Sequence, residues 1–293
     1  MKIIHSYWSK PSIEKGYDRS AGGWSDKKYN YMSWALSCLQ FKKYYSEVEL
    51  ITDKLGKELL IDKLELPYTS VKVELDQLND YHSDLWALGK IYAYSIQDKP
   101  FMHADGDLFI WKKFDSDLES ASLFAQNQEL NFPYHFDSVK EMEDNLPYIP
   151  VCIQEERAIN KDDIYGCNAG IFGGNNISFF KEYTKEAFAF VDKNINDIHK
   201  INIGRFNITY EQFLFLCLAK YKNIKIHYFT EGVDHHFKGM TNFNRVPKKT
   251  TFIHPVGYYK KYKPIGEHIA MRLLADYPSY FYKIEKLIRN FQL

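Results

Sequence analysis

The sequence lacks an excess of charge of either sign. Lys and Arg together number 38, and so do Asp and Glu, so the formal net charge is zero. A chain whose main task is nucleic-acid binding normally carries a basic excess, so this balance argues against that class of function. Hydrophobic residues make up 45% of the chain and charged residues 26%, which are the ordinary proportions of a soluble globular protein.

Cysteine is scarce, and the four that occur are scattered through the chain: Cys38, Cys152, Cys167 and Cys217. None belongs to a C-x-x-C pair or has the spacing of a metal site. All four stand among apolar residues, so we expect reduced, buried thiols. The N-terminus is too polar for a secretory signal, and no apolar run is long enough to span a bilayer. These absences predict a cytoplasmic protein.

Aromatic residues are abundant. They make up 17% of the chain, with 23 Tyr and 21 Phe. A tyrosine ring offers an apolar face and a polar tip, which suits stacking on sugar rings or bases. Composition drift in an A+T-rich genome would enrich the same residues, so the aromatic content alone does not decide the function.

The first third of the chain alternates strand-like and helix-like segments. Strand patterns fall at residues 2–8, 47–52, 69–75 and 101–104, and helical spacing of apolar residues falls at 29–44, 57–64 and 85–96. This alternation predicts a mainly parallel sheet flanked by helices. Residues 115–163 are less regular, and we interpret them as a strand followed by a lid or acceptor wall. Further on, we expect helices over 177–193 and from Thr209, a strand over 224–229 and a helical tail over 268–293.

The strand at 101–104 runs directly into Asp105-Gly106-Asp107. One intervening residue lets both carboxylates reach the same side of an extended backbone. Paired carboxylates can hold a hard divalent cation, and such a cation can bind a diphosphate. A tight Asp-Gly turn between two strands would explain the same residues. A second Asp-x-Asp at 115–117 follows two lysines, and we interpret it as a solvated turn.

A second pattern, His254-x-x-Gly257-x-x-Lys260, stands near the C-terminus. An imidazole can complete a cation site built mainly from oxygen ligands. A glycine lets the backbone approach a phosphate closely, and a lysine can neutralise the charge of a diphosphate. A basic surface loop is the alternative, because Lys261 and Lys263 follow.

Two shorter patterns lie between these. Asn168-Ala169-Gly170 combines small residues with an amide that can hydrogen-bond sugar hydroxyls, and a Gly-rich turn is the alternative. Glu211-Gln212 stands where we expect a helix to begin, and a carboxylate is favoured at that position by the helix dipole alone.

Taken together and in this order, the four patterns resemble the family 8 glycosyltransferases and their relatives with the GT-A fold. The resemblance extends over nearly the whole chain. Three departures stand out. Glu211 occurs where the family usually has Asp, Lys260 is followed by Lys-Tyr-Lys-Pro rather than directly by Pro-Trp, and the stretch from Asp107 to Asn168 is long. We therefore expect a distant relative with a GT-A-type, Rossmann-like α/β fold, in which a mixed, mainly parallel sheet is flanked by helices and followed by a helical tail.

The resemblance implies a role for each matching residue. Asp105, Asp107 and His254 would bind Mn²⁺ or Mg²⁺. Asp105, Gly257 and Lys260 would contact the nucleotide diphosphate. The catalytic and sugar-binding group would be Asn168, Glu211 and Gln212.

Three further residues are candidates for binding the nucleotide sugar. Tyr7 ends the first strand and could pack on the base, although it could equally be an aromatic residue of the hydrophobic core. Asp84 and Lys90 belong to the helix before the metal strand, which in related transferases commonly lends a basic group to the donor. His235 and His236 form a polar pair near the expected acceptor side, and adjacent residues point in different directions, so at most one of them would act.

The resemblance implies a hexosyltransferase-type enzyme that moves a sugar from a nucleotide diphosphate to the hydroxyl of a carbohydrate or lipid-linked acceptor. UDP is the nucleotide expected first. Bacterial surface polysaccharide or glycoconjugate synthesis is the expected setting. Retention is favoured, with Glu211 as general base of an inverting reaction as the alternative. A haloacid-dehalogenase-like phosphatase and a non-catalytic carbohydrate-binding protein remain open.

We expect a single domain over residues 1–293. Residues 1–114 would form its nucleotide-binding half, 115–263 its acceptor and donor-sugar half, and 264–293 the C-terminal helical tail. The tail mixes aromatic with basic residues. It could rest on the inner face of an anionic membrane or pack on the domain as an ordinary helix.

Overall fold

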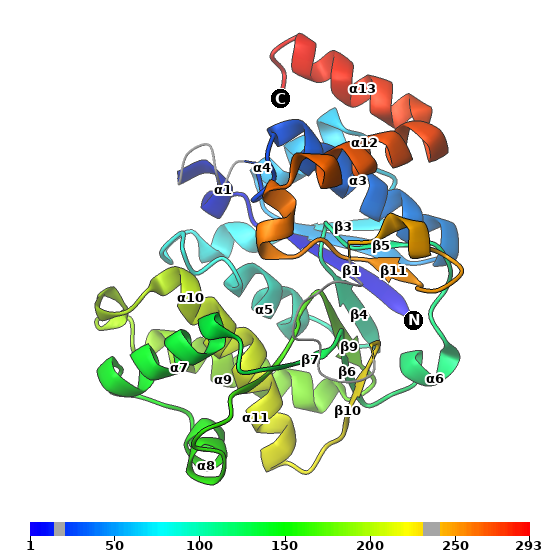
Figure 1. Cartoon of the computed structure of the whole chain (residues 1–293). Coiled ribbons are helices and arrows are strands. Elements are labelled where there is room, and N and C mark those ends of the chain that lie inside the picture. Colours follow the sequence, from blue (N-terminus) through cyan, green and yellow to red (C-terminus); the bar gives the residue numbers. More distant parts are fainter. Residues whose placement is uncertain (15–20, 231–240) are drawn as a thin grey trace. The chain divides into compact units, whose positions relative to one another are not determined.

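The computed structural model describes residues 1–14, 21–230 and 241–293 (Figure 1). The described residues divide into two compact units. The first unit lies within Met1, Asp80–Ala104 and Asp115–His236, and the second within Lys2–Asn79, Asp105–Phe114 and Phe237–Leu293. His235 and His236 lie outside the described residues. The expectation of a single domain with three subdivisions stays a prediction.

The second unit contains three parallel strands, β1 (Lys2–Tyr7), β2 (Val48–Thr52) and β3 (Ser70–Val73). β1 pairs with β2 from Ile3↔Val48 onward, and β2 pairs with β3 from Glu49↔Ser70 onward. All five residues of β2 are buried, as expected for the central strand of three. A separate antiparallel pair joins β5 (Phe109–Ile110) to β11 (Phe252–Ile253).

The long helix α3 (Lys27–Tyr44) organises the core of the second unit. Asp26 caps its N-terminus by accepting a hydrogen bond from the Lys28 N–H at 2.9 Å. α12 (Lys263–Asp276) and α13 (Pro278–Arg289) both pack against α3 (Figure 1). The remaining helical segments of this unit are α1 (Lys10–Glu14), α4 (Lys54–Lys57), the π-helical turn η1 (Glu58–Lys63), and the short 3-10 turns η2 (Leu75–Leu78), η5 (Phe243–Arg245) and η6 (Gly257–Lys261).

The first unit contains four strands in the order β10, β6, β9, β4. These are β4 (Phe101–Ala104), β6 (Leu123–Ala125), β9 (Ile171–Gly174) and β10 (Ile226–Tyr228). β9 runs antiparallel to both β4 and β6, whereas β10 runs parallel to β6. A smaller antiparallel pair joins β7 (Gln128–Leu130) to β8 (Tyr165–Cys167).

Helices flank the strands of the first unit. They are α5 (Leu88–Ser95), α6 (Ser116–Glu119), α7 (Pro133–Asn145), α8 (Val151–Ile159), α9 (Ile177–Asp192), the 3-10 turn η3 (Ile198–Lys200), α10 (Ile203–Ile208), the π-helical turn η4 (Thr209–Phe213) and α11 (Leu214–Tyr221).

The predicted fold class is confirmed. Parallel pairing of β1–β2, β2–β3 and β6–β10, with β9 as the antiparallel strand, gives the mixed, mainly parallel α/β arrangement. The chain also carries the expected C-terminal helices, although α12 already begins at Lys263. Among the residues described, no helix is both long and apolar enough to cross a membrane.

Residues 115–163 are more regular than the sequence predicts. Pro133 is the first residue of α7, and Pro150 is the N-cap of α8. A helix begins readily at proline, because the N–H that proline lacks would have no partner within the first turn. The prolines therefore mark helix starts in a segment whose sequence predicts irregular structure.

Candidate functional site

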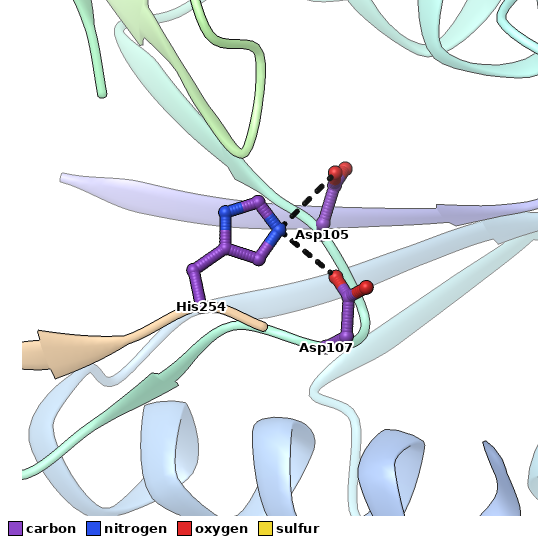
Figure 2. Close-up of side chains that lie close together, drawn as sticks. All are labelled: Asp105, Asp107 and His254. Atoms are coloured by element: carbon purple, nitrogen blue, oxygen red, sulfur yellow. Dashed lines mark ion pairs between the residues drawn. The ribbon is translucent and has the colours of Figure 1, made fainter. Parts of the chain in front are cut away.

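Asp105, Asp107 and His254 converge in the second unit (Figure 2). Nε2 of His254 lies 3.3 Å from Oδ1 of Asp107 and 4.0 Å from Oδ2 of Asp105. One ligand atom from each of the three residues can be chosen so that all lie within 4.8 Å of one another. His254 and Asp107 are buried, and the side chain of Asp105 is 22% exposed. The group is therefore preformed and open to solvent at Asp105.

The pairing of β5 with β11 brings the two sequence segments together. Ile253 is opposite Phe109, and Phe252 is opposite Ile110. The N–H of Trp111 extends this pairing by donating to the carbonyl of Thr251 at 3.0 Å. His254 follows β11 and Asp107 shortly precedes β5, so antiparallel pairing sets them at the same end of the two strands.

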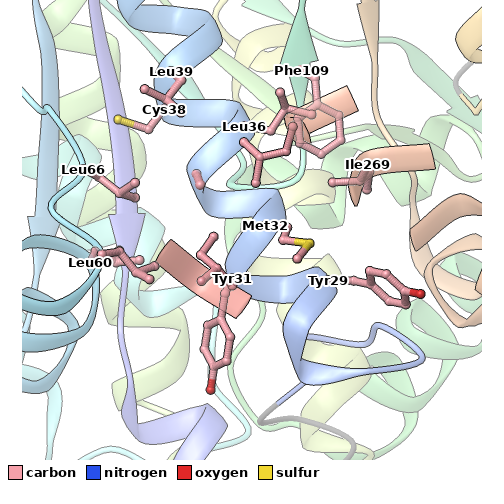
Figure 3. Close-up of a cluster of buried hydrophobic side chains, with 14 of the residues drawn as sticks. Tyr29, Tyr31, Met32, Leu36, Cys38, Leu39, Leu60, Leu66, Phe109 and Ile269 are labelled. Carbon is pink, nitrogen blue, oxygen red and sulfur yellow. The ribbon is translucent and has the colours of Figure 1, made fainter. Parts of the chain in front are cut away.

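Two serines of α3 hold the backbone of the Asp105–Leu108 turn. The hydroxyl of Ser33 donates to the carbonyl of Gly106 at 2.8 Å. The hydroxyl of Ser37 donates to the carbonyl of Leu108 at 2.7 Å. The serines are four residues apart and so share a helix face. Leu36 of α3 and Phe109 of β5 lie in the buried hydrophobic cluster beside them (Figure 3).

Trp34 packs against Gly106, the residue between the two aspartates. A Cβ at Gly106 would lie 2.5 Å from Cε2 of the Trp34 ring. The Trp34 ring also meets the ring of Tyr7 edge-on, with centroids 5.1 Å apart. Only glycine fits between the aspartates, and Tyr7 lies in the same aromatic group as the metal-site turn.

Lys260 forms an ion pair with Oδ2 of Asp107. Burial alone would raise the pKa of the Asp107 carboxyl, but Lys260 and His254 outweigh burial and hold that pKa far below its usual range. Asp107 is therefore ionised throughout the physiological pH range.

His5 of β1 lies close to Ser37, one of the two serines that hold this turn. Its Nδ1 is 2.8 Å from the Tyr68 hydroxyl, and its Nε2 is 3.5 Å from the hydroxyl of Ser37. Burial lowers the pKa of His5 to about 3, and the charge of Asp107 opposes this effect only in part. The imidazole is therefore neutral at pH 7.

The two remaining candidates in the second unit differ in their surroundings. Tyr7 ends β1, and burial raises the pKa of its hydroxyl to about 12; the hydrogen bond with Ser12 opposes this rise, and the charge of Asp53 adds to it. Gly257 is exposed and has a φ of +49°, a backbone conformation that favours glycine. No heavy atom would lie within 4 Å of a Cβ at Gly257, so space remains there for a ligand.

A separate polar cluster in the first unit contains several of the other candidates. Nζ of Lys90 lies 3.2 Å from Oε1 of Glu211 and 3.5 Å from the carbonyl of Ala169. Glu211 is completely buried in the π-helical turn η4. π-Helical turns recur at functional sites. Lys90 thus links the Asn-Ala-Gly segment to the Glu-Gln pair.

Asn168 is held by a buried carboxylate, Glu129, that no sequence motif indicates. Nδ2 of Asn168 donates to Oε1 of Glu129 at 2.8 Å, and Oδ1 accepts from the Gly170 N–H at 3.0 Å. Oε2 of Glu129 lies 2.7 Å from Nε2 of His135 and accepts from the Tyr134 hydroxyl at 2.8 Å. This network fixes the orientation of Asn168.

Gln212 and Asp84 are the last two residues that the sequence suggests for the site. Within the described part of the chain, nothing hydrogen-bonds to the buried Oε1 of Gln212. Asp84 lies in the turn before α5, where its carbonyl accepts from Nδ2 of Asn207 at 2.6 Å. Oδ1 of Asn207 accepts from the Ala87 N–H, so α5 begins at Leu88 rather than at the predicted 85.

The donor set fits a hard divalent cation. Two carboxylate oxygens and one imidazole nitrogen supply three ligands, and carboxylates suit Mg²⁺ and Mn²⁺. A three-residue set leaves other coordination positions for oxygens of a ligand or water.

The comparisons with known proteins give a family and remote structural likenesses. A family model described as "Family of unknown function (DUF6734)" matches residues 1–287. No curated protein matches the chain. Mouse xyloside xylosyltransferase 1 in its apo form is 9% identical, with a TM-score of 0.38 over 78% of this chain and 84% of that one.

Two structures of LgtC are also similar. The galactosyltransferase LgtC in complex with donor and acceptor sugar analogues is 11% identical, with a TM-score of 0.37 over 72% of this chain and 70% of that one. An active-site mutant of LgtC is 11% identical, with a TM-score of 0.41 over 87% of this chain and 86% of that one. These structures are glycosyltransferases, but at such TM-scores the likeness carries no argument about this chain.

Proposed function

Because the chain belongs to DUF6734, a family of unknown function, we propose its activity from its own residues: it is a metal-dependent glycosyltransferase that uses a nucleoside diphosphate sugar. The observation that supports this most strongly is the convergence of Asp105, Asp107 and His254, with Lys260 on the same carboxylate. Carboxylates, an imidazole and an ammonium in one place suit a cation together with a polyanion better than either alone.

The proposed reaction breaks the bond between the anomeric carbon of the sugar and the diphosphate oxygen and forms a bond from that carbon to the oxygen of the acceptor hydroxyl, whose proton passes to the departing phosphate. Negative charge develops on the departing phosphate oxygen, and a bound Mn²⁺ or Mg²⁺ would supply Lewis-acid stabilisation of that charge. Lys260 contributes a second positive charge, and Gly257 leaves space for the phosphate to approach the backbone. Tyr7 is the candidate for packing on the base, with UDP as the first donor to test.

Gln212 is proposed to hydrogen-bond the sugar, since its buried Oε1 has no hydrogen-bond partner among the described residues. Glu211 is buried beside Lys90, where it serves as a counter-ion of that lysine. This placement disfavours Glu211 as a solvent-exposed general base and is compatible with retention. Asn168, oriented by Glu129, is the second amide proposed to bind the sugar. The acceptor is a carbohydrate or lipid-linked hydroxyl.

The biological setting is part of the proposal. It is synthesis of bacterial surface polysaccharide or glycoconjugate, in the cytoplasm or at the inner face of its membrane. Exposed aromatic side chains at Tyr282 of α13 and at Phe291 support contact of the C-terminal helices with a lipid surface.

The test is a thermal-shift panel of UDP, GDP, CDP and ADP with and without Mn²⁺. We expect UDP to raise the melting temperature by roughly 5 °C at 100 times its Kd, and only when Mn²⁺ is present. The variant Asp107→Asn should lose this shift, whereas Asp117→Asn, in the solvated second Asp-x-Asp, should keep it.

Other outcomes would favour the alternative functions. Release of phosphate from simple phosphate esters would indicate a phosphatase. A shift caused by free sugars without nucleotide or metal would indicate a carbohydrate-binding protein. An unchanged melting temperature with every nucleotide, both with and without Mn²⁺, would contradict the proposal.

A further inference from the structure

Asp107 divides its two carboxylate oxygens between two partners. Oδ1 faces Nε2 of His254 at 3.3 Å, on the side of the three candidate ligands. Oδ2 is held by the ammonium of Lys260. A positive charge therefore already occupies one side of the carboxylate that a cation would need.

Lys260 is fixed in this position by the segment before α3. Its carbonyl accepts a hydrogen bond from the Ser25 N–H at 3.2 Å. Its Nζ lies 5.9 Å from the centroid of the Trp24 ring, and Trp24 is 4% exposed. With its side chain only 21% exposed, Lys260 is an ordered part of the site.

The charges of the site have a consequence for the order of binding. Two carboxylates and one ammonium leave a net charge of −1 before any contribution from the imidazole. A divalent cation reverses that charge to +1, and it must bind close to an ammonium that repels it. An added diphosphate supplies negative charge to both cations and removes this conflict.

We propose that Lys260 is an internal counter-ion of Asp107 that weakens cation binding until a nucleoside diphosphate takes over the ammonium. Cation and nucleotide then bind cooperatively, each raising the affinity for the other by the same factor, as linkage requires. This inference rests on the proposed function. It adds that the site discriminates against the cation alone, so that the cation is bound with the substrate.

The experiment measures Mn²⁺ affinity by paramagnetic resonance of free Mn²⁺, with and without UDP. It compares the wild type with Lys260→Met, with the charge-conserving Lys260→Arg and with Lys261→Met as a control at an exposed neighbouring lysine. In the wild type and the Lys261→Met control, UDP should tighten Mn²⁺ binding about tenfold or more. Lys260→Met should bind Mn²⁺ alone about tenfold more tightly than the wild type, and UDP should tighten its Mn²⁺ binding by a smaller factor than in the wild type, because only direct coordination of the diphosphate remains. Lys260→Arg should remain close to the wild type.

The outcomes separate the two proposals. If Lys260→Met binds Mn²⁺ alone no more tightly than the wild type, while UDP and Mn²⁺ still bind together, the counter-ion inference fails and the proposed function stands. If UDP changes the wild-type Mn²⁺ affinity less than twofold, the inference fails without reference to any variant. If neither the wild type nor Lys260→Arg binds Mn²⁺ or UDP, both proposals fail.

Discussion

The hydroxyl of Ser37 donates a 2.7 Å hydrogen bond to the carbonyl of Leu108, and so ties α3 to the residue that follows Asp107. Ser33 does the same one helical turn earlier, at Gly106. The metal-site turn is therefore held to the helix through its backbone, and its carboxylates are left for ligands.

Removing these hydroxyls should loosen the turn. We expect Ser33→Ala and Ser37→Ala each to lower the free energy of unfolding by about 1 kcal/mol, the net contribution of one hydrogen bond. Both should weaken Mn²⁺ binding in the presence of UDP several-fold, although neither side chain is a ligand. Urea denaturation and metal titration measure the two effects. Ser46→Ala, at an exposed serine of the same unit, is the control, and a variant at Ser37 that matches it in both measurements would contradict the role given to the turn.

Two glycine-to-alanine changes should separate crowding from backbone strain. At Gly106 the new methyl group would meet the Trp34 ring, so we expect a loss of about 1–3 kcal/mol and a marked loss of metal binding. At Gly257 the methyl group meets nothing, and only the left-handed backbone is strained, at about 1 kcal/mol. Calorimetry measures the stability and the metal affinity of both variants. Equal metal affinities in the two variants would contradict the view that the packing of Trp34 against Gly106 supports the site.

The network around Glu129 should be sensitive to loss of its charge. Glu129→Gln keeps the shape but replaces a carboxylate that serves Tyr134, His135 and Asn168. We expect a loss of about 2–3 kcal/mol, since hydrogen bonds to a buried charged group are the strong ones. Tyr134→Phe removes one of the three bonds and should cost about 1 kcal/mol. Chemical denaturation gives both values. A Glu129→Gln variant more stable than the wild type would show that burial of the charge destabilises the fold by more than its hydrogen bonds stabilise it.

The free energy of unfolding should decrease as the pH is lowered, because of His5. Its pKa is about 3 in the folded protein and 6.5 in its ordinary state, so below pH 6.5 the unfolded chain takes up a proton that the folded protein does not. The stabilisation is complete above pH 6.5 and is lost as the pH falls toward 3, by up to about 1.4 kcal/mol per pH unit.

The comparison that isolates this effect uses His5→Gln. Its stability difference from the wild type should shrink as the pH falls from 7 to 5 in urea denaturation experiments. His82→Gln, at a side chain that is 47% exposed, should keep the wild-type slope. Parallel slopes for the wild type and His5→Gln would show that His5 does not carry the pH dependence.

Local patterns were sufficient for the strands that lead to the site. Phe101–Ala104 is a strand with the predicted bounds, because the apolar run between Pro100 and the two aspartates is short; the preceding helix α5 already ends at Ser95, before Pro100. The spacing of His254, Gly257 and Lys260 indicated a shared anionic ligand, and the structure adds that Lys260 reaches Asp107 itself.

The supporting residues could not be predicted in the same way. Ser33 and Ser37 stand one helical turn apart on a largely buried helix, which is a signal for a polar contact, but the sequence does not say which carbonyls they reach. Glu211 does not stand at a helix start, as the sequence suggests, because α10 leads directly into η4 and α11. Its partner depends on tertiary packing that brings Lys90 beside it, and local sequence carries no information about that. Glu129 reads as an ordinary strand residue, although it is completely buried.

The packing of α12 and α13 on α3 has a consequence for biosynthesis. Ile269, Leu273 and Ile284 complete the hydrophobic cluster that supports the serine-bearing helix, and all three are translated after His254. On the ribosome, the segment with the two aspartates emerges long before the side chains that secure it. A nascent chain halted before these helices would expose apolar surface at α3, so the second unit should acquire its cation affinity only late in synthesis.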